Sequence, residues 1–119
     1  MKTHYVYILS NKMKTVLYVG VTNDLERRIF EHKTGHGSKF CIKYKITDLM
    51  YYEKYPLIVD AIAREKQLKN WHRKWKWNLI KTKNKYLYDI SREWYDRETR
   101  ENLEECKKLD QLPEYYRKP

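Results

Sequence analysis

Hydrophobic and polar positions near the N-terminus follow a pattern that predicts two β-strands. Residues 4–9 and 16–21 are dense in aromatic and β-branched side chains, and a polar stretch, 10–15, separates them. This pattern is typical of a β-hairpin whose loop is longer than two residues. Because side chains alternate between the faces of a strand, Tyr7 and Tyr18 are expected to share one surface of the hairpin.

The next segment carries the signals of a helix N-terminus. Residues 22–24 supply side chains that can cap a helix, and Glu26 follows Asn23 by three residues, as in a capping box. We predict a helix from about Asp24 to Lys33, and glycines follow it.

Residues 34–46 interleave basic and aromatic side chains, among them Lys39, Phe40, Lys43 and Tyr44. This composition suits a loop or a short helix that contacts a phosphate backbone. Lys39 and Lys43 are therefore candidate substrate-binding residues.

The remaining pattern predicts a strand and two helical segments. Residues 48–55 form a strand stopped by Pro56, and a helix follows over 58–74. A second helical segment continues to about residue 82 after a bend within 72–76, and the tryptophans of this region are expected to fill the core. The order of elements indicates an α+β fold, a small antiparallel sheet packed with helices.

The chain length of 119 residues suits one compact domain, and the composition is strongly basic, with a formal net charge of +10. Residues 1–88 carry 19 Lys and Arg against 7 Asp and Glu, whereas residues 89–119 carry 7 against 9. Such a charge favours a polyanionic partner: nucleic acid first, then an anionic membrane or an acidic protein.

The two cysteines, Cys41 and Cys106, lie far apart and belong to no Cys-x-x-Cys pair. This spacing excludes a zinc site of the usual cysteine pattern and a fold held together by disulfides. No apolar run is long enough to cross a bilayer, so we expect a soluble cytoplasmic protein without a membrane partner.

Glu65 is the most informative anomaly, because it falls on the apolar stripe of the predicted helix 58–74, four residues after Ala61 and three before Leu68. An ionised carboxylate beside a core needs a cation, a metal ion or hydrogen-bond donors. A structural salt bridge to a lysine or arginine would satisfy it as well as a metal would.

Arg28 and His32 are four residues apart and share a helix face beside the apolar positions Leu25 and Ile29. Alone, such a pair is more often solvated or structural than catalytic. Phosphodiester hydrolysis, however, needs a base for water, neutralisation of phosphoryl charge and stabilisation of the leaving oxygen. Tyrosine, arginine, histidine and a metal-binding glutamate can supply all three.

The ordered set of these residues resembles the GIY-YIG nuclease family, in particular its small single-domain bacterial members. Val6-Tyr7 and Tyr18-Val19-Gly20 are similar to its two half-motifs, with Arg28 ten residues after Tyr18 and His32 four further on. The helix around Glu65 is similar to the family's glutamate helix. The resemblance covers residues 4 to about 90. Two positions depart from it, since the first half-motif lacks its glycine and Val21 stands where some excision-repair relatives have lysine.

The resemblance implies a three-stranded antiparallel sheet flanked by helices and a single divalent ion, Mg²⁺ or Mn²⁺, held by Glu65. It implies that Tyr7 or Tyr18 orients or deprotonates the attacking water, with Tyr7 favoured as the base. Arg28 would neutralise charge and His32 would assist proton transfer. Further substrate contacts are expected from a small set: Gly20, Lys39, Lys43, Lys69 and Asn84, with Asn78 as the alternative to Asn84.

We therefore expect residues 1–90 to form a metal-dependent endonuclease domain that cuts DNA with structure selectivity or low sequence specificity, in DNA repair or processing. Residues 91–119 would form a charged extension, either an additional C-terminal helix or a partly disordered tail. The alternatives are a nucleic-acid-binding module with weak or no activity and a basic protein-interaction domain.

Overall fold

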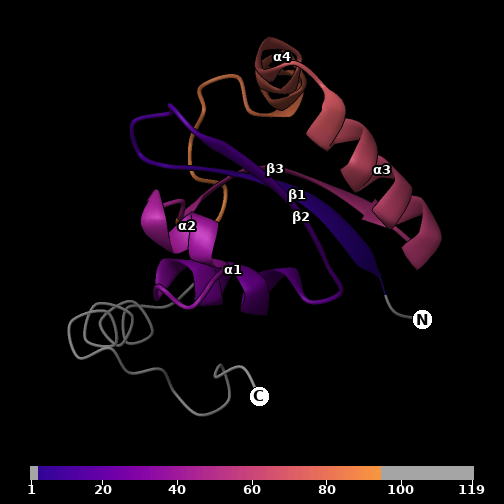
Figure 1. The fold of residues 1–119 in the computed structure, drawn as a ribbon, viewed down its shortest axis with the longest axis horizontal. Helices are drawn as coiled ribbons and strands as arrows, with labels where there is room; N and C mark the ends of the chain where they lie inside the picture. Colours follow the sequence, from indigo (N-terminus) through magenta and orange to yellow (C-terminus); the bar gives the residue numbers. More distant parts are fainter. Residues whose placement is uncertain (1–2, 95–119) are drawn as a thin grey trace.

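The apolar run near the N-terminus forms the central strand of a three-stranded antiparallel sheet in the computed structural model, which describes residues 3–94 (Figure 1). The strands are β1 (His4–Ser10), β2 (Leu17–Thr22) and β3 (Asp48–Tyr55), in the order β2-β1-β3. The helices are α1 (Leu25–Lys33), α2 (Lys39–Lys43), α3 (Ile58–Asn70) and α4 (Arg73–Lys83). The predicted α+β fold is confirmed.

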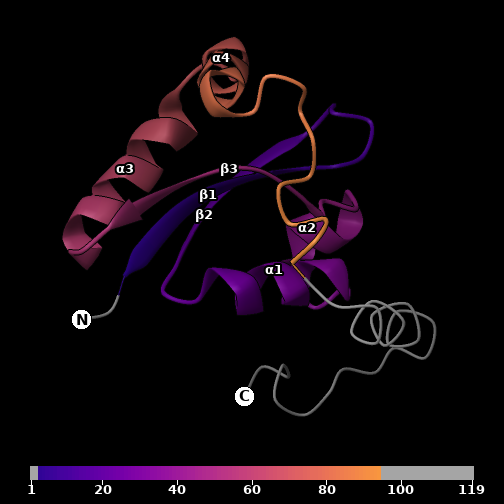
Figure 2. The ribbon, with the colours of Figure 1, turned by 180° about the vertical axis from the view of Figure 1, so that it is seen from behind.

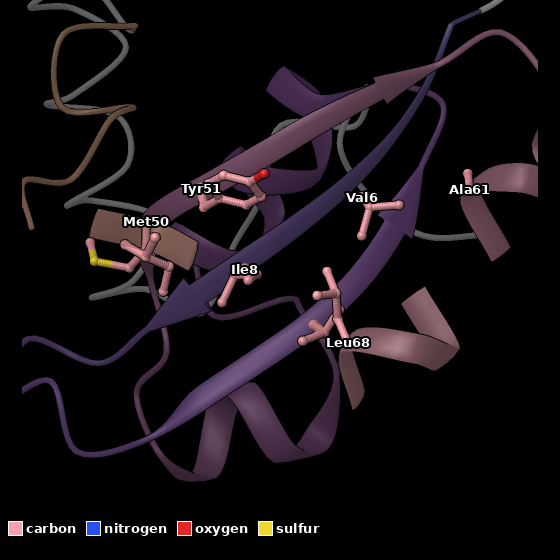
Figure 3. Packing of buried hydrophobic residues seen from close by; sticks show 8 residues of the cluster. Val6, Ile8, Met50, Tyr51, Ala61 and Leu68 are labelled. Atoms are coloured by element: carbon pink, nitrogen blue, oxygen red, sulfur yellow. The ribbon is translucent and has the colours of Figure 1, made fainter. Parts of the chain in front are cut away.

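Helices cover both faces of the sheet, which explains why β1 is apolar at consecutive positions rather than at alternate ones. Figures 1 and 2 show α1 and α2 on one side and α3 and α4 on the other. The α1 face has a core of Tyr7, Leu9, Leu25, Ile29, Cys41, Ile46 and Leu49. The α3 face has a core of Val6, Ile8, Val19, Met50, Tyr51, Ala61, Leu68 and Ile80 (Figure 3).

The strand register places Tyr7 opposite Gly20 and Leu9 opposite Tyr18. Tyr7 and Tyr18 therefore lie on the same face, as the alternation predicts. On the other side of β1 the register shifts between Ile8 and Leu9, which leaves Met50 as an extra residue in β3. Such a bulge is not visible in the sequence pattern.

The cap of α1 differs from the predicted capping box. Asp24 is the N-cap, and its side-chain oxygen accepts a hydrogen bond from the main-chain N–H of Arg27 at 3.2 Å. Thr22 in turn accepts from the N–H of Asp24 at 3.1 Å. The capping residue is Asp24 rather than Asn23, because the Asp24 side chain accepts the free main-chain N–H of Arg27 in the first turn of the helix.

Two expectations for the second half of the chain were wrong in detail. The helix that begins at Ile58, α3, ends at Asn70 rather than near residue 74, because the chain turns at Trp71 and restarts as α4. Trp75 was expected in the core but is 55% exposed, and Ile58 and Ile62 of α3 are exposed as well. Ala61 and Leu68 are the buried positions of α3, so its apolar stripe is narrower than the sequence indicates.

A half-buried ion pair fixes α3 to β3. The Arg64 guanidinium donates to both carboxylate oxygens of Glu53, at 2.9 and 3.0 Å, and the hydroxyls of Tyr51 and Tyr55 donate to the same carboxylate. Burial raises the pKa of Glu53, but the Arg64 and tyrosine hydrogen bonds outweigh it and leave the pKa below its usual value. All these groups are satisfied, so the pair gives α3 a defined position.

The chain after α4 crosses from the α3 face to the α1 face along the outer edge of β3 (Figure 2). Ile90 donates its N–H to the Leu49 carbonyl at 2.8 Å, and Asp89 accepts the Leu49 N–H at 3.0 Å. Packing on the α1 face continues to Trp94, beyond the domain boundary expected at residue 90. The predicted C-terminal extension covers residues 91–119, and its part after Trp94 lies outside the described residues.

Asp89 also binds Lys33, the last residue of α1, at 2.5 Å. This contact joins the segment after α4 to the helix that carries Arg28 and His32. None of the helices within residues 3–94 has the length and apolar character needed to span a bilayer.

We expect Asp89→Asn to lower the free energy of unfolding at pH 7 by about 1–3 kcal/mol, because an amide nitrogen would then face the Lys33 ammonium. Burial raises the pKa of Asp89, but Lys33, Ser91 and the Leu49 N–H lower it more, so the folded pKa lies below the unfolded one. The stabilisation is therefore present above the ordinary aspartate pKa of about 3.9 and is lost as the pH falls through the folded value.

Urea unfolding at pH 7 and pH 3 measures this effect, with the exposed Glu93→Gln in the same segment as the matched control. The gap between wild type and Asp89→Asn should shrink at pH 3. A gap of equal size at both values would contradict the assigned ion pair.

Candidate active site

The ring of Tyr7 lies directly on the backbone of Gly20. A Cβ atom added at Gly20 would be closer than 3.0 Å to the Cζ, Oη and Cε2 atoms of Tyr7, a separation that real Cβ atoms do not show. The glycine of the second half-motif therefore makes room for the tyrosine of the first. The sequence suggests Gly20 as a substrate contact, whereas in the structure the Tyr7 ring occupies the space beside Gly20.

Tyr7 bridges the two α1 residues that the sequence singles out. Arg28 Nε donates to Tyr7 Oη at 3.4 Å, and Tyr7 Oη lies 3.4 Å from His32 Nε2. Because the phenol oxygen accepts the hydrogen bond from Arg28, the phenol hydrogen can be donated to His32 in the tautomer whose Nε2 carries no hydrogen. The three side chains form one polar row at the base of the site.

Tyr18 completes this group from the edge strand β2. Its ring centroid lies 5.9 Å from that of His32 and 6.4 Å from that of Tyr7. Tyr18 is partly exposed, whereas Tyr7 is 1% exposed. The structure thus brings together four predicted site residues on the α1 face, where Tyr18 and Arg28 are partly exposed and Tyr7 and His32 are buried.

Burial dominates the electrostatics of Tyr7. It raises the pKa of the phenol above its usual value, and the hydrogen bond and positive charge of Arg28 offset only part of that effect. Burial lowers the pKa of Arg28, but its interactions with Tyr7 and Glu31 raise the pKa by more. The guanidinium therefore stays charged. Glu31 Oε1 lies 3.8 Å from Arg28 Nη1 and helps to hold this cation in place.

Glu65 belongs to α3 and so to the opposite side of the sheet. Its carboxylate is 16% exposed and binds the Lys69 ammonium at 2.7 Å. This is the salt bridge that competes with the metal interpretation, and Lys69 itself is 52% exposed on its outer side. The described contacts do not join Glu65 to Tyr7, Tyr18, Arg28 or His32, although α3 packs against β2, the strand that carries Tyr18.

The donor set around Glu65 fits a weakly held Mg²⁺ rather than a preformed metal centre. Within residues 3–94 there is no cluster of three or more His, Cys, Asp or Glu side chains that could hold a metal ion. Mg²⁺ commonly binds through one or two carboxylates, keeps several waters and takes further ligands from a phosphate. The single Glu65 carboxylate, paired with the half-exposed ammonium of Lys69, is compatible with that mode.

The other predicted contacts are spread over the molecule. Lys39 and Lys43 are exposed on α2, the helix whose Phe40 contacts Tyr18, whereas Lys69 is the partner of Glu65. Asn84 is buried, and its amide donates to the Met50 and Tyr88 carbonyls and accepts the Tyr88 N–H. Because all of these bonds lie within the fold, we do not carry Asn84 into the proposed site.

Sequence patterns missed two residues that shape the site. A Cβ added at Gly37 would lie 2.8 Å from His32 Cε1, so Gly37 permits the position of the imidazole. Phe40 lies on Tyr18, with centroids 6.2 Å apart and planes at 28°. The sequence does show glycines after α1 and aromatic residues among the lysines that follow. It does not show which residues these side chains contact.

We expect Gly20→Ala to destabilise the protein by about 1–3 kcal/mol, since the added methyl group overlaps the Tyr7 ring. Chemical unfolding of a double-mutant cycle with Tyr7→Ala tests the assignment. In the Tyr7→Ala background the cost of Gly20→Ala should fall to a few tenths of a kcal/mol. An equal cost in both backgrounds would place the steric conflict elsewhere.

Comparison with known proteins identifies the family of this chain. The GIY-YIG catalytic domain matches residues 3–84. A UPF0213 protein of Staphylococcus saprophyticus is 35% identical over 80 residues, which cover 67% of this chain and 96% of the relative. One of Natronomonas pharaonis is 36% identical over 77 residues, covering 65% and 89%. The solution NMR structure of a UPF0213 protein from Bacillus halodurans is similar with a TM-score of 0.48 at 29% identity, covering 76% of this chain and 97% of that one. The chain therefore belongs to the family of GIY-YIG catalytic domains, a nuclease superfamily.

Proposed function

We propose that this protein is a metal-dependent endonuclease that hydrolyses phosphodiester bonds in DNA. The observation that carries the proposal is the row Arg28–Tyr7–His32, with Tyr18 beside it on one face of the sheet. A cation, a proton acceptor and a solvent-facing hydroxyl are the groups that phosphoryl transfer to water requires.

Arg28 is suited to neutralise charge on the phosphoryl oxygens. Its Nε is engaged by Tyr7, and its guanidinium remains 20% exposed at the side chain, so it reaches a bound phosphate from a fixed position. A preorganised cation stabilises developing charge without the cost of reorientation.

The two tyrosines differ in what they can do. Tyr7 is buried, and its pKa is raised, so it does not supply a phenolate at neutral pH. We assign it the bridge between Arg28 and His32. Tyr18 is closer to solvent and beside His32, so we assign it the contact to the attacking water, with His32 taking up the proton. This reverses the preference for Tyr7 as the base.

Glu65 is the proposed ligand of a single Mg²⁺ or Mn²⁺. When bound, the ion would polarise the phosphate and stabilise the leaving oxygen. Lys69 holds the carboxylate in the metal-free protein and would be released from it on binding. Since α3 packs on β2, a phosphate at this edge strand would have Glu65 on one side and Tyr18 on the other.

The positive charge of residues 1–88 supports a nucleic acid as the substrate, with Lys39 and Lys43 flanking the site on α2. The chain offers no separate sequence-reading module within the described residues, which favours structure-selective or relaxed cutting, as in DNA repair or processing. A binding module without turnover is the second candidate, because the Glu65–Lys69 pair is satisfied without a metal.

Glu65→Gln should reduce the cleavage rate by about 100-fold or more in Mg²⁺ or Mn²⁺, because the amide is a poor ligand for either ion. Purified protein would be incubated with single-stranded, duplex, flap and branched DNA, with and without a chelator. Asp60→Asn, which alters an exposed carboxylate on the same helix, is the matched control. Cleavage without metal, or cleavage that survives Glu65→Gln, would reject the metal assignment.

Tyr18→Phe should slow cleavage by about 100-fold and Tyr7→Phe by about tenfold, because only Tyr18 faces the solvent side of the site. Single-turnover rates at saturating enzyme separate this effect from binding. The opposite order would return the base role to Tyr7.

A further inference from the structure

A cavity of about 580 Å³ opens beside the proposed catalytic row, between the loop after β1, the end of α1 and α2. We call it the α2 cavity. His32 forms part of its wall and also contacts Tyr7, so the cavity and the row share one side chain. A ligand group in the cavity would lie next to whatever occupies the active site.

The lining of the α2 cavity suits a flat, weakly polar group. Met13, Cys41, Ile42 and Tyr44 supply sulfur, aliphatic and aromatic surface. Met13 is 80% exposed and Ile42 is 50% exposed, so both leave apolar surface open to a ligand in the cavity. A volume in this range is typical of small-molecule sites and exceeds the size of one nucleobase.

A row of aromatic rings leads from the catalytic residues to this cavity. Tyr18 and Phe40 are near-parallel, and Phe40 lies 4.7 Å from Tyr44, which lines the cavity. Phe40 is 45% exposed and Tyr44 is 41% exposed. Partly exposed rings beside a backbone-binding groove are the surfaces on which unpaired bases stack.

Lysines line the α2 cavity or contact its aromatic wall. Lys43 lies over the Tyr44 ring, with Nζ 5.3 Å from the centroid. Lys12 and Lys45 are exposed at the mouth of the cavity, while Lys33 is held by Asp89. An apolar slot ringed by lysines is complementary to a base and its phosphates, and less so to an apolar peptide.

We propose that the α2 cavity and the Phe40–Tyr44 pair bind one nucleobase of the strand that is cut, adjacent to the scissile phosphate. The proposal rests on the proposed function, because it uses the catalytic row to place that phosphate. The bound base stacks on Phe40 and Tyr44 and enters the cavity beside His32. Neither ring touches the reacting atoms, so both residues act in substrate positioning.

Abasic substitution of short oligodeoxynucleotides tests the site in the full chain. Removing each base in turn around the cut, or along the oligonucleotide if nothing is cut, should identify one position where binding by the wild type weakens about 5- to 100-fold. Binding would be measured by fluorescence anisotropy in a chelator, so that turnover is not needed. Phe40→Leu and Tyr44→Leu should weaken binding of the intact strand by a similar factor.

The decisive readout is the coupling between protein and base. In Phe40→Leu or Tyr44→Leu, removal of the critical base should cost at most about twofold, because its partner is already lost. Tyr86→Leu, which alters a 70% exposed tyrosine outside the cavity, should keep the full wild-type abasic penalty. Circular dichroism would show that each variant is folded.

The outcomes separate the two proposals. Coupling at one position without any cleavage supports the base site and rejects the nuclease. Cleavage with equal abasic penalties in wild type and in the α2 variants rejects the base site and leaves the nuclease intact. A penalty that Tyr86→Leu also removes would likewise reject the α2 cavity as the site.

Discussion

The contact of the Tyr7 ring with the Gly20 backbone fixes the candidate active site. A residue with a side chain at position 20 would push the phenol away from Arg28 and His32, since the added carbon would overlap its hydroxyl. The pairing of the two positions follows from the β1–β2 register, in which Tyr7 is opposite Gly20. The separate half-motifs of the sequence are therefore one structural unit, with the glycine of one strand accommodating the tyrosine of the other.

Burial of β1 on both faces makes that unit rigid. Val6 and Ile8 pack under α3, while Tyr7 and Leu9 pack under α1 and α2. The helices are tied to the sheet by different means. The Glu53–Arg64 pair holds α3 to β3, and the Asp89–Lys33 pair holds the end of α1 to the outer edge of the same strand. The half-buried charged groups of both ion pairs have hydrogen-bond partners, so each ion pair fixes the position of its helix on the sheet.

The sequence predicted the elements well because their apolar periods are strong, but it could not predict contacts between elements. The strand Asp48–Tyr55 and the start of α3 at Ile58 were expected at those residues. The ion pairs of Glu53 and Asp89 join residues 11 and 56 positions apart, and no local pattern encodes such partners. Glu65 was conspicuous for its apolar surroundings, yet its partner Lys69 is one helical turn away. That pair could have been read from the i,i+4 spacing.

The proposed site is divided between the two faces of the sheet, and each half has its own partners. The row on the α1 face is held together by Arg28, Tyr7 and His32, and Glu65 on the α3 face is neutralised by Lys69. Each half is satisfied without the other, so the fold requires no metal to offset buried charge. In the proposed site a phosphate and its counter-ion would contact both halves at β2, an edge strand of the sheet against which α3 packs. In this arrangement the substrate completes the proposed catalytic centre, and binding energy from the rest of the strand must displace Lys69 from Glu65.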